Sequence, residues 1–219
     1  MAYNVISLED MNKSMNEKEL KNILNEFECY LNKDVEYFIK EKSIEFLKMG
    51  ISKTFLVTTS YKGNNVIVGY FALANKVTRV KRSSLSHSLK RRMARFAELD
   101  ELNQTYTISL PLIGQLSKNF KNNYNKLITG DVLLKLACDK VKEAQQILGG
   151  NFVFLECEDK SILKEFYESN GFVCFDKRNL EKDERDKNSG EYLLQMLCYL
   201  KNDWKRLATQ ASLFLYFKY

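Results

Sequence analysis

The first quarter of the chain changes between two hydrophobic periods. Apolar side chains alternate over a short N-terminal stretch and then recur at steps of three and four, as in Val35, Phe38 and Ile39. Gly50 follows the second helical stretch, where a glycine commonly ends a helix. The pattern predicts a strand over 3–8, helices over 16–25 and 34–49, and a hairpin of strands 53–60 and 66–76 with its turn near 62–65.

The middle of the chain carries a basic segment followed by a strand. Apolar residues in the basic segment recur at helical intervals, which predicts an inserted amphipathic helix over 82–102. The strand pattern over 105–118 contains Pro111 and Gly114, two residues that interrupt or bulge a regular ladder.

The last third alternates helices and strands. A helix over 129–148 ends at two glycines, and a shorter helix over 161–170 precedes Gly171. The remaining strands are predicted over 151–157, 172–175 and 191–200. Beyond Leu200, an apolar stripe from Trp204 to Leu215 predicts a C-terminal helix, packed on its own domain or in a homodimer contact.

The composition indicates one soluble domain. A chain of 219 residues lies below the roughly 250 residues beyond which cores usually divide. Apolar residues make up 45% and charged residues 28%, as in ordinary globular proteins. No stretch is apolar over the roughly 20 residues that a membrane span needs, and residues 1–10 lack signal-peptide order. We therefore expect a cytoplasmic protein without a membrane partner.

The cysteine and histidine content disfavours metal sites and Ser-His-Asp catalysis. The five cysteines are scattered without a CxxC pair, which argues against a disulfide framework and a zinc site. His87 is the single histidine, so Ser-His-Asp chemistry and multi-histidine metal sites are disfavoured. No metal is expected.

The positive charge is concentrated in one segment. Of a formal net charge of +6, eight Lys and Arg side chains and no Asp or Glu fall between Lys76 and Ala97. Four of them, Lys90, Arg91, Arg92 and Arg95, are candidate contacts for the phosphates of a nucleic acid. A solvated helix face and a clamp on a cofactor phosphate are equally open interpretations, and few aromatics interleave the run.

Three stretches resemble the GCN5-related N-acetyltransferases (GNATs). LIGQLSKNF (112–120) with NKLITGDVLLKLA (125–137) is similar to the acetyl-CoA-binding motif of that family, and CEDKSILKEFYESNGF (157–172) is similar to its "FY…GF" signature. The stretch 27–57 resembles a subgroup that includes bacterial toxins acetylating aminoacyl-tRNA. The predicted order of elements also resembles that of the GNAT fold: a strand, two helices, a strand pair, an interrupted strand, a long helix, a strand, a short helix and the final strands.

The resemblance implies an α+β fold and an activity. It predicts a mostly antiparallel, splayed sheet flanked by helices over 1–200, with 201–219 as a helical extension. It implies acetyl transfer from acetyl-CoA to a primary amine by direct attack, with the amine of an aminoacyl-tRNA as the leading acceptor and an antitoxin as a further partner. A small-molecule or protein amine, and a non-catalytic CoA-binding module, are the alternatives.

The resemblance also assigns the acetyl-CoA site. A bulged strand leaves backbone free to pair with the pantetheine arm, which implicates Leu116, Ser117 and Lys118. The turn into the next helix suits a pyrophosphate, which implicates Lys126, Leu127, Ile128, Thr129 and Gly130. This turn keeps only the last glycine of the pattern that the family prefers.

Tyr167 is the candidate catalytic residue, because the family signature places this tyrosine near the CoA sulfur. A phenol with a pKa of about 10 can return a proton to the departing thiolate. Apart from the resemblance, a core tyrosine on a helix face, with its hydroxyl hydrogen-bonded, is the favoured interpretation of Tyr167. No residue is marked as a general base, because Glu156 and Glu158 fit solvated positions at a strand end equally well.

Overall fold

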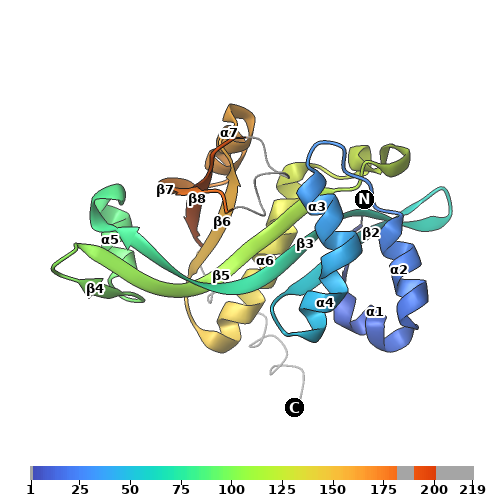
Figure 1. Cartoon of the computed structure of the whole chain (residues 1–219), viewed down its shortest axis with the longest axis horizontal. Helices are drawn as coiled ribbons and strands as arrows, with labels where there is room; N and C mark the ends of the chain where they lie inside the picture. Colours follow the sequence, from blue (N-terminus) through green and yellow to red (C-terminus); the bar gives the residue numbers. More distant parts are fainter. Residues whose placement is uncertain (1, 182–189, 201–219) are drawn as a thin grey trace, which may run out of the picture.

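The structure, a computed structural model, describes residues 2–181 and 190–200 (Figure 1). Within these ranges eight strands form one sheet in the order β1-β2-β3-β5-β6-β8-β7, and β4 pairs with β5 beside this path. Only β5 and β6 run parallel among the described pairs. The predicted α+β class and mostly antiparallel sheet are confirmed. The predicted C-terminal helix over 201–219 lies outside the described residues.

Every strand that the hydrophobic pattern predicts is present, and one further strand, β4, was not predicted. Their bounds are Asn4–Ser7 (β1), Lys53–Tyr61 (β2), Asn64–Lys81 (β3), Glu98–Asp100 (β4), Thr105–Lys118 (β5), Phe152–Glu158 (β6), Val173–Asn179 (β7) and Tyr192–Tyr199 (β8). β3 is longer than the predicted strand, and β4 replaces part of a predicted helix.

The helices lie on both faces of the sheet. Their bounds are Leu8–Ser14 (α1), Glu17–Asn25 (α2), Lys33–Tyr37 (α3), Ser43–Lys48 (α4), His87–Met93 (α5), Gly130–Leu148 (α6) and Ser161–Ser169 (α7), with short turns at Phe38–Lys42 (η1, π-helical), Arg82–Ser84 (η2) and Lys121–Leu127 (η3). Several begin at a side-chain cap. In α2, Asn16 and Glu19 form a reciprocal capping box, which satisfies amides that the helix leaves free.

Two hydrophobic cores lie on opposite faces of the β1–β3 half of the sheet. On one face, α2, α3 and η1 bury Leu20, Leu24 and Ile39 against Tyr70 of β3. On the other face, α6 and α7 pack on Val57, Phe71 and Met196 together with further strand residues. Figure 1 shows α1–α4 on one side of the strands and α6 on the other. The strands, including β5, therefore lie between two layers of helices.

Two local predictions require correction near the N-terminus. α1 was not expected, because its apolar positions are Leu8, which is buried, and Met11, which is partly buried, and two positions establish no period. The helix predicted over 34–49 forms, but its middle turn is π-helical, and the Ser43 hydroxyl donates to the Ile39 carbonyl at 2.6 Å. Such a π-turn adds a residue without ending the helix.

The inserted basic helix predicted over 82–102 forms only over His87–Met93, as α5, so its predicted bounds are wrong. This segment folds as η2, α5 and β4, and β4 pairs with β5 from Glu98↔Thr107 to Asp100↔Thr105. Leu99 satisfied a helical interval, but it equally satisfies a strand beside β5, and tertiary pairing decides between them. Together with the distal halves of β3 and β5, the segment forms a projection that we call the arm, residues 75–111 (Figure 1).

The predicted interruption of β5 is real and falls at Gly114. Ala72 pairs with Gln115 and Leu73 pairs with Ile113, so Gly114 is the extra residue of a β-bulge. Pro111 keeps its register opposite Asn75 and causes no shift. The bulge therefore lies at Gly114 and not at the proline.

Gly69 lies where β3, β5 and α6 approach one another closely. A Cβ at Gly69 would lie 2.9 Å from the Ser117 carbonyl oxygen and 3.1 Å from a Leu133 methyl carbon. We expect Gly69→Ala to lower the free energy of unfolding by about 1–3 kcal/mol, measured by denaturant titration. Gly114→Ala is the matched control, since its Cβ would meet Leu112 at 3.7 Å. Equal stabilities for the two variants would contradict this account.

Candidate active site

A cavity opens where β5 and β6 separate. The two strands pair only at Leu112↔Phe154 and Ile113↔Leu155. Beyond these pairs β5 follows β3 and β6 follows β8, so the strands diverge with a cavity of about 560 Å³ between them. Its walls come from β5, β6, the start of α6, α7 and the segment before α3.

The first wall is the free edge of β5. Leu116, Ser117 and Lys118 line the cavity and pair with β3 through Phe71, Tyr70 and Gly69. The pairing uses one edge of β5, so the other edge faces the space left by β6. An extended chain carrying amides can pair with such an edge as an added strand. The structure thus brings together the three residues predicted to hold the pantetheine arm.

The loop before α6 contributes less to the cavity than predicted. Gly130 lines it, whereas Lys126, Leu127, Ile128 and Thr129 are not among its lining residues. The Ile128 side chain is buried in the core, and the Thr129 hydroxyl caps α6 by accepting from the Val132 amide at 3.2 Å. Pyrophosphate binding at this loop stays a prediction that would use backbone amides at the start of the 19-residue α6.

The packing of α6 against α7 explains why residue 130 is a glycine. A Cβ there would lie 3.0 Å from the ring of Phe166, so glycine allows α6 and α7 to approach closely. In the preceding turn Asn122 and Asn123 have φ values of 50° and 60°, a left-handed conformation that asparagine adopts more readily than most residues. The asparagine-rich sequence of this loop therefore follows from its backbone.

Tyr167 reaches the cavity from α7. Its side chain is buried, packs beside Phe166 and Phe172 at ring-centroid distances of 4.9 and 5.8 Å, and lines the same cavity as Ser117. Its hydroxyl forms no hydrogen bond with the part of the chain that the structure describes. Burial raises the pKa of Tyr167 well above its usual value, so the phenol is protonated at neutral pH. Such a group can donate a proton.

Glu156 is unsuited to accept a proton. Its carboxylate is 2.9 Å from Arg178 Nη2, 2.9 Å from Gln195 Nε2 and 3.3 Å from Lys76 Nζ. Burial raises the pKa of Glu156, but the Arg178 and Gln195 hydrogen bonds and the Lys76 charge outweigh it and leave the pKa below its ordinary value. Glu156 is therefore an ionised, fully engaged group. Glu158 also lines the cavity, 2.8 Å from Lys160 Nζ.

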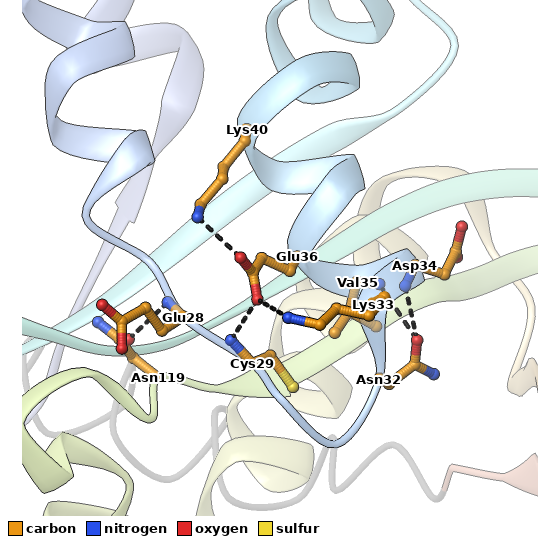
Figure 2. A network of polar contacts seen from close by, with 9 residues as sticks. All are labelled: Glu28, Cys29, Asn32, Lys33, Asp34, Val35, Glu36, Lys40 and Asn119. Carbon is orange, nitrogen blue, oxygen red and sulfur yellow. Dashed lines mark hydrogen bonds and ion pairs between the residues drawn. The ribbon is translucent and has the colours of Figure 1, made fainter. Parts of the chain in front are cut away.

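The sequence did not reveal the wall opposite α7. Cys29 and Asn32 line the cavity from the segment between α2 and α3, and Asp34 and Val35 line it from the first turn of α3. Figure 2 shows how it is held: the Glu36 carboxylate accepts from the Cys29 amide at 2.9 Å, and the Asn32 side chain accepts from the Asp34 amide at 2.8 Å. The Asn32 cap was a readable signal, but its proximity to β5 was not.

Two side chains from β5 and its exit attach this wall to the sheet. Asn119, buried, accepts from the Glu28 amide at 3.1 Å and donates to the Ile67 carbonyl at 2.9 Å (Figure 2 shows the first contact). Gln115 Nε2 donates to an Asp34 carboxylate oxygen at 3.1 Å. The bulged strand therefore positions both its own edge and the facing wall.

The basic residues predicted to contact substrate lie away from this cavity. Lys90, Arg91 and Arg92 are on α5 and Arg95 follows it, and none is among the cavity residues. The guanidinium of Arg92 lies over the Tyr199 ring, 4.4 Å from its centroid. The structure thus separates Tyr167 from the basic segment.

Comparisons with solved structures place the fold. AtaT complexed with acetyl-methionyl-tRNAfMet matches with a TM-score of 0.57 at 15% identity, over 89% of this chain and 94% of AtaT. A tyrosine-to-phenylalanine mutant of KacT matches with 0.57 at 14% identity, over 89% and 94%. An AtaT mutant bound to acetyl-CoA and the C-terminus of the antitoxin AtaR matches with 0.51 at 14% identity, over 88% and 91%.

The chain therefore has the GNAT fold. Within that class, it is structurally similar to the toxins AtaT and KacT. No family model and no curated protein matches the sequence.

Metal ligands and membrane spans are absent from the described residues. These residues contain no group of three or more His, Cys, Asp and Glu side chains that could hold a metal ion. None of their helices is both long and apolar enough to cross a membrane.

The pairing of Glu156 has a pH signature. Because its folded pKa lies below the unfolded value of about 4.3, the stability from this carboxylate is complete above that value and is lost as pH falls through the folded pKa. We expect wild type to exceed Glu156→Gln in unfolding free energy at pH 7, with the difference shrinking below about pH 4. Denaturant titrations across pH measure this. A difference independent of pH would exclude the ionised pair as its source.

Proposed function

We propose that this protein is an acetyl-CoA-dependent N-acetyltransferase with Tyr167 as the general acid. The observation that carries the proposal is the convergence of Tyr167 and the free edge of β5, residues 116–118, on one cavity where β5 and β6 diverge. Solved structures of the same fold, such as the AtaT mutant noted above, contain acetyl-CoA. The cavity offers both a strand edge for a pantetheine arm and a protonated phenol for its sulfur.

The reaction is a direct transfer. The acceptor amine, in its neutral form, attacks the thioester carbonyl carbon, a C–N bond forms, and the C–S bond breaks with its electron pair going to sulfur. Tyr167 gives its proton to the CoA thiolate, and the proton lost from the acceptor nitrogen leaves to water, which later reprotonates the phenolate. Burial favours the neutral phenol before and after each cycle.

The cysteine in the cavity fits direct transfer. Cys157 lines the same cavity, but burial raises the pKa of its thiol to about 12. The nucleophilic thiolate is therefore scarce at neutral pH. An acetyl-cysteine intermediate is not needed, and the amine attacks acetyl-CoA in a ternary complex.

The acceptor we favour is the amino group of an aminoacyl-tRNA. AtaT, of the same fold, has been solved with an acetylated aminoacyl-tRNA. An α-amine has an ordinary pKa of about 8, so a sizeable fraction is neutral near pH 7 and needs no strong base. This agrees with a cavity in which Glu156 is already engaged. By the same analogy, an antitoxin partner resembling AtaR remains a prediction.

A CoA-binding module without turnover is the second candidate. The loop 126–130 keeps one glycine of the expected pattern, and four of its five residues do not line the cavity. If this loop holds the pyrophosphate poorly, acetyl-CoA would bind weakly or unproductively.

Acetyl-CoA binding separates these candidates from an unrelated function. At 100 times the dissociation constant, a ligand that binds only the folded state adds about 2.7 kcal/mol to its stability. We expect acetyl-CoA to raise the melting temperature, with desulfo-CoA binding similarly. Binding without CoA release on any amine would support the non-catalytic module, and no stabilisation at millimolar acetyl-CoA would refute both.

Replacing the phenol tests its role directly. We expect Tyr167→Phe to lower kcat about 10²-fold or more while leaving acetyl-CoA binding nearly unchanged, because the ring remains and only the proton donor is lost. Tyr106→Phe is the matched control, since Tyr106 is buried in the arm and is not a cavity residue. An unchanged rate in Tyr167→Phe would remove Tyr167 from the mechanism.

The acceptor can be identified by finding which molecule receives a labelled acetyl group. The protein is incubated with isotopically labelled acetyl-CoA and separately with charged tRNA, cell protein and a panel of small amines, and products are resolved by mass spectrometry. We expect label on the aminoacyl group of tRNA. Label found solely on protein or small amines would replace the favoured acceptor and keep the acetyltransferase.

A further inference from the structure

The arm carries positive charge that the rest of the protein does not neutralise. Three of the eight basic side chains between 76 and 97 are engaged: Lys76 with Glu156, Lys81 with Asp176, and Arg92 over Tyr199. The other five form no ion pair with a described residue, and all but the half-buried Lys90 are exposed. We call these five the arm surface: Arg79, Arg82, Lys90, Arg91 and Arg95.

A hydrophobic core lies beneath the arm surface and fixes the elements that carry it. Val80, Leu85, Met93 and Tyr106 are buried in a core that extends to Phe152 of β6, so η2, α5 and the strands of the arm pack as one unit. Phe96 contacts Phe152 edge to face at 6.1 Å between centroids, which fastens the segment after α5 to the sheet. The cations are therefore presented in a defined arrangement.

Hydrogen-bonding side chains accompany the cations. Arg79 pairs with Thr107 and Lys81 with Thr105 across the β3–β5 ladder, so each cation stands beside a hydroxyl on the same face. Glu98 and Asp100 of β4 pair with the same two threonines from the other side, so this part of the arm also carries acidic side chains. At the tip, Lys81, Arg82 and Lys90 line a cleft of about 640 Å³ with Asn103, Gln104 and Thr105, and no acidic residue is part of that lining. Arginine, lysine, hydroxyl and amide groups are those that contact phosphates in nucleic-acid complexes.

Other partners fit this surface less well. The exposed large apolar side chains of the arm, Val77, Phe96 and Leu102, come from three separate segments, whereas a protein interface or a lipid surface requires a gathered apolar patch. The surface also lacks the row of exposed aromatics on which single-stranded bases stack. A continuous phosphate backbone, as in a base-paired stem, needs neither.

From this geometry we infer that the arm is a docking surface for the phosphate backbone of an RNA stem, separate from the cavity at Tyr167. The inference rests on the proposed function in that the docked RNA would carry the acceptor amine. Binding is independent of base sequence, since the surface offers charges and hydroxyls to phosphates. Arg92 is not a phosphate contact, because its guanidinium is committed to Tyr199.

The test compares two variants of equal charge. One carries Arg82→Gln, Arg91→Gln and Arg95→Gln on the arm; the other carries Lys18→Gln, Lys21→Gln and Lys135→Gln on α2 and α6, which are exposed and distant from the arm in sequence. Each removes three positive charges from the formal +6. Binding of uncharged tRNA is measured by fluorescence anisotropy between 50 and 200 mM salt, so the readout does not require activity.

We expect the arm variant to bind tRNA about tenfold or more weakly and to reduce the salt slope of log K by about one for each phosphate that it no longer neutralises. The control variant should retain the wild-type slope. Acetylation of a small primary amine should be equal in all three proteins, whereas KM for aminoacyl-tRNA should rise in the arm variant with kcat unchanged.

The outcomes separate the two proposals. Equal tRNA binding by wild type, arm variant and control, or no tRNA binding by wild type, would overturn the arm inference while leaving acetyl transfer to a small amine as a test of the cavity. Loss of tRNA binding in the arm variant, with no acetyl transfer by any protein, would support the arm and refute the proposed reaction. A weakening shared by both variants would show unspecific charge attraction and would also overturn the arm inference.

Discussion

The separation of β5 from β6 is the constraint on which the rest of the site depends. Two strands that pair at Leu112↔Phe154 and Ile113↔Leu155 cannot continue as neighbours, because the Gly114 bulge shifts the register of β5 and each strand is held by another partner. Backbone hydrogen-bonding groups at the diverging edge need a partner, and in a cavity this partner can be a ligand. The same separation admits Tyr167 from α7 and the wall that contains Asp34.

The charges around this opening serve different purposes. Inside, Glu156 is an ionised carboxylate held by Arg178, Gln195 and Lys76, so it joins β6 to β7, β8 and the base of the arm. Burial raises the pKa of the Tyr167 phenol and of the Cys157 thiol, so both groups keep their protons at neutral pH. Outside, the side chains of the arm surface form no ion pair with a described residue, and most of them are exposed. On the two proposals above, RNA docking and acetyl transfer would take place in separate regions.

Much of the fold was readable before the structure. The apolar runs of β2, β3, β6 and β8 and the helical periodicity of α2, α6 and α7 predicted the right elements, since these segments are long, strongly apolar or strongly amphipathic. The failures were α1, with a single buried residue, and the segment 82–102, where helical and strand interpretations of Leu99 were equally consistent with the apolar spacing. In the site, Leu116–Lys118 and Tyr167 were identified through a family signature, and the structure brings them to one cavity.

The sequence by itself determined the class of fold, an interruption of the strand that contains Pro111 and Gly114, and a concentration of positive charge, because local period, breaking residues and charge are properties of neighbouring residues. Only the tertiary structure decided which groups meet. It placed Cys29, Asn32 and Asp34 opposite Tyr167, engaged Glu156 on all sides, and committed Arg92 to Tyr199 while leaving Arg82 and Arg95 exposed. These contacts join residues from distant parts of the chain, so they depend on strand order and helix packing that no local pattern encodes.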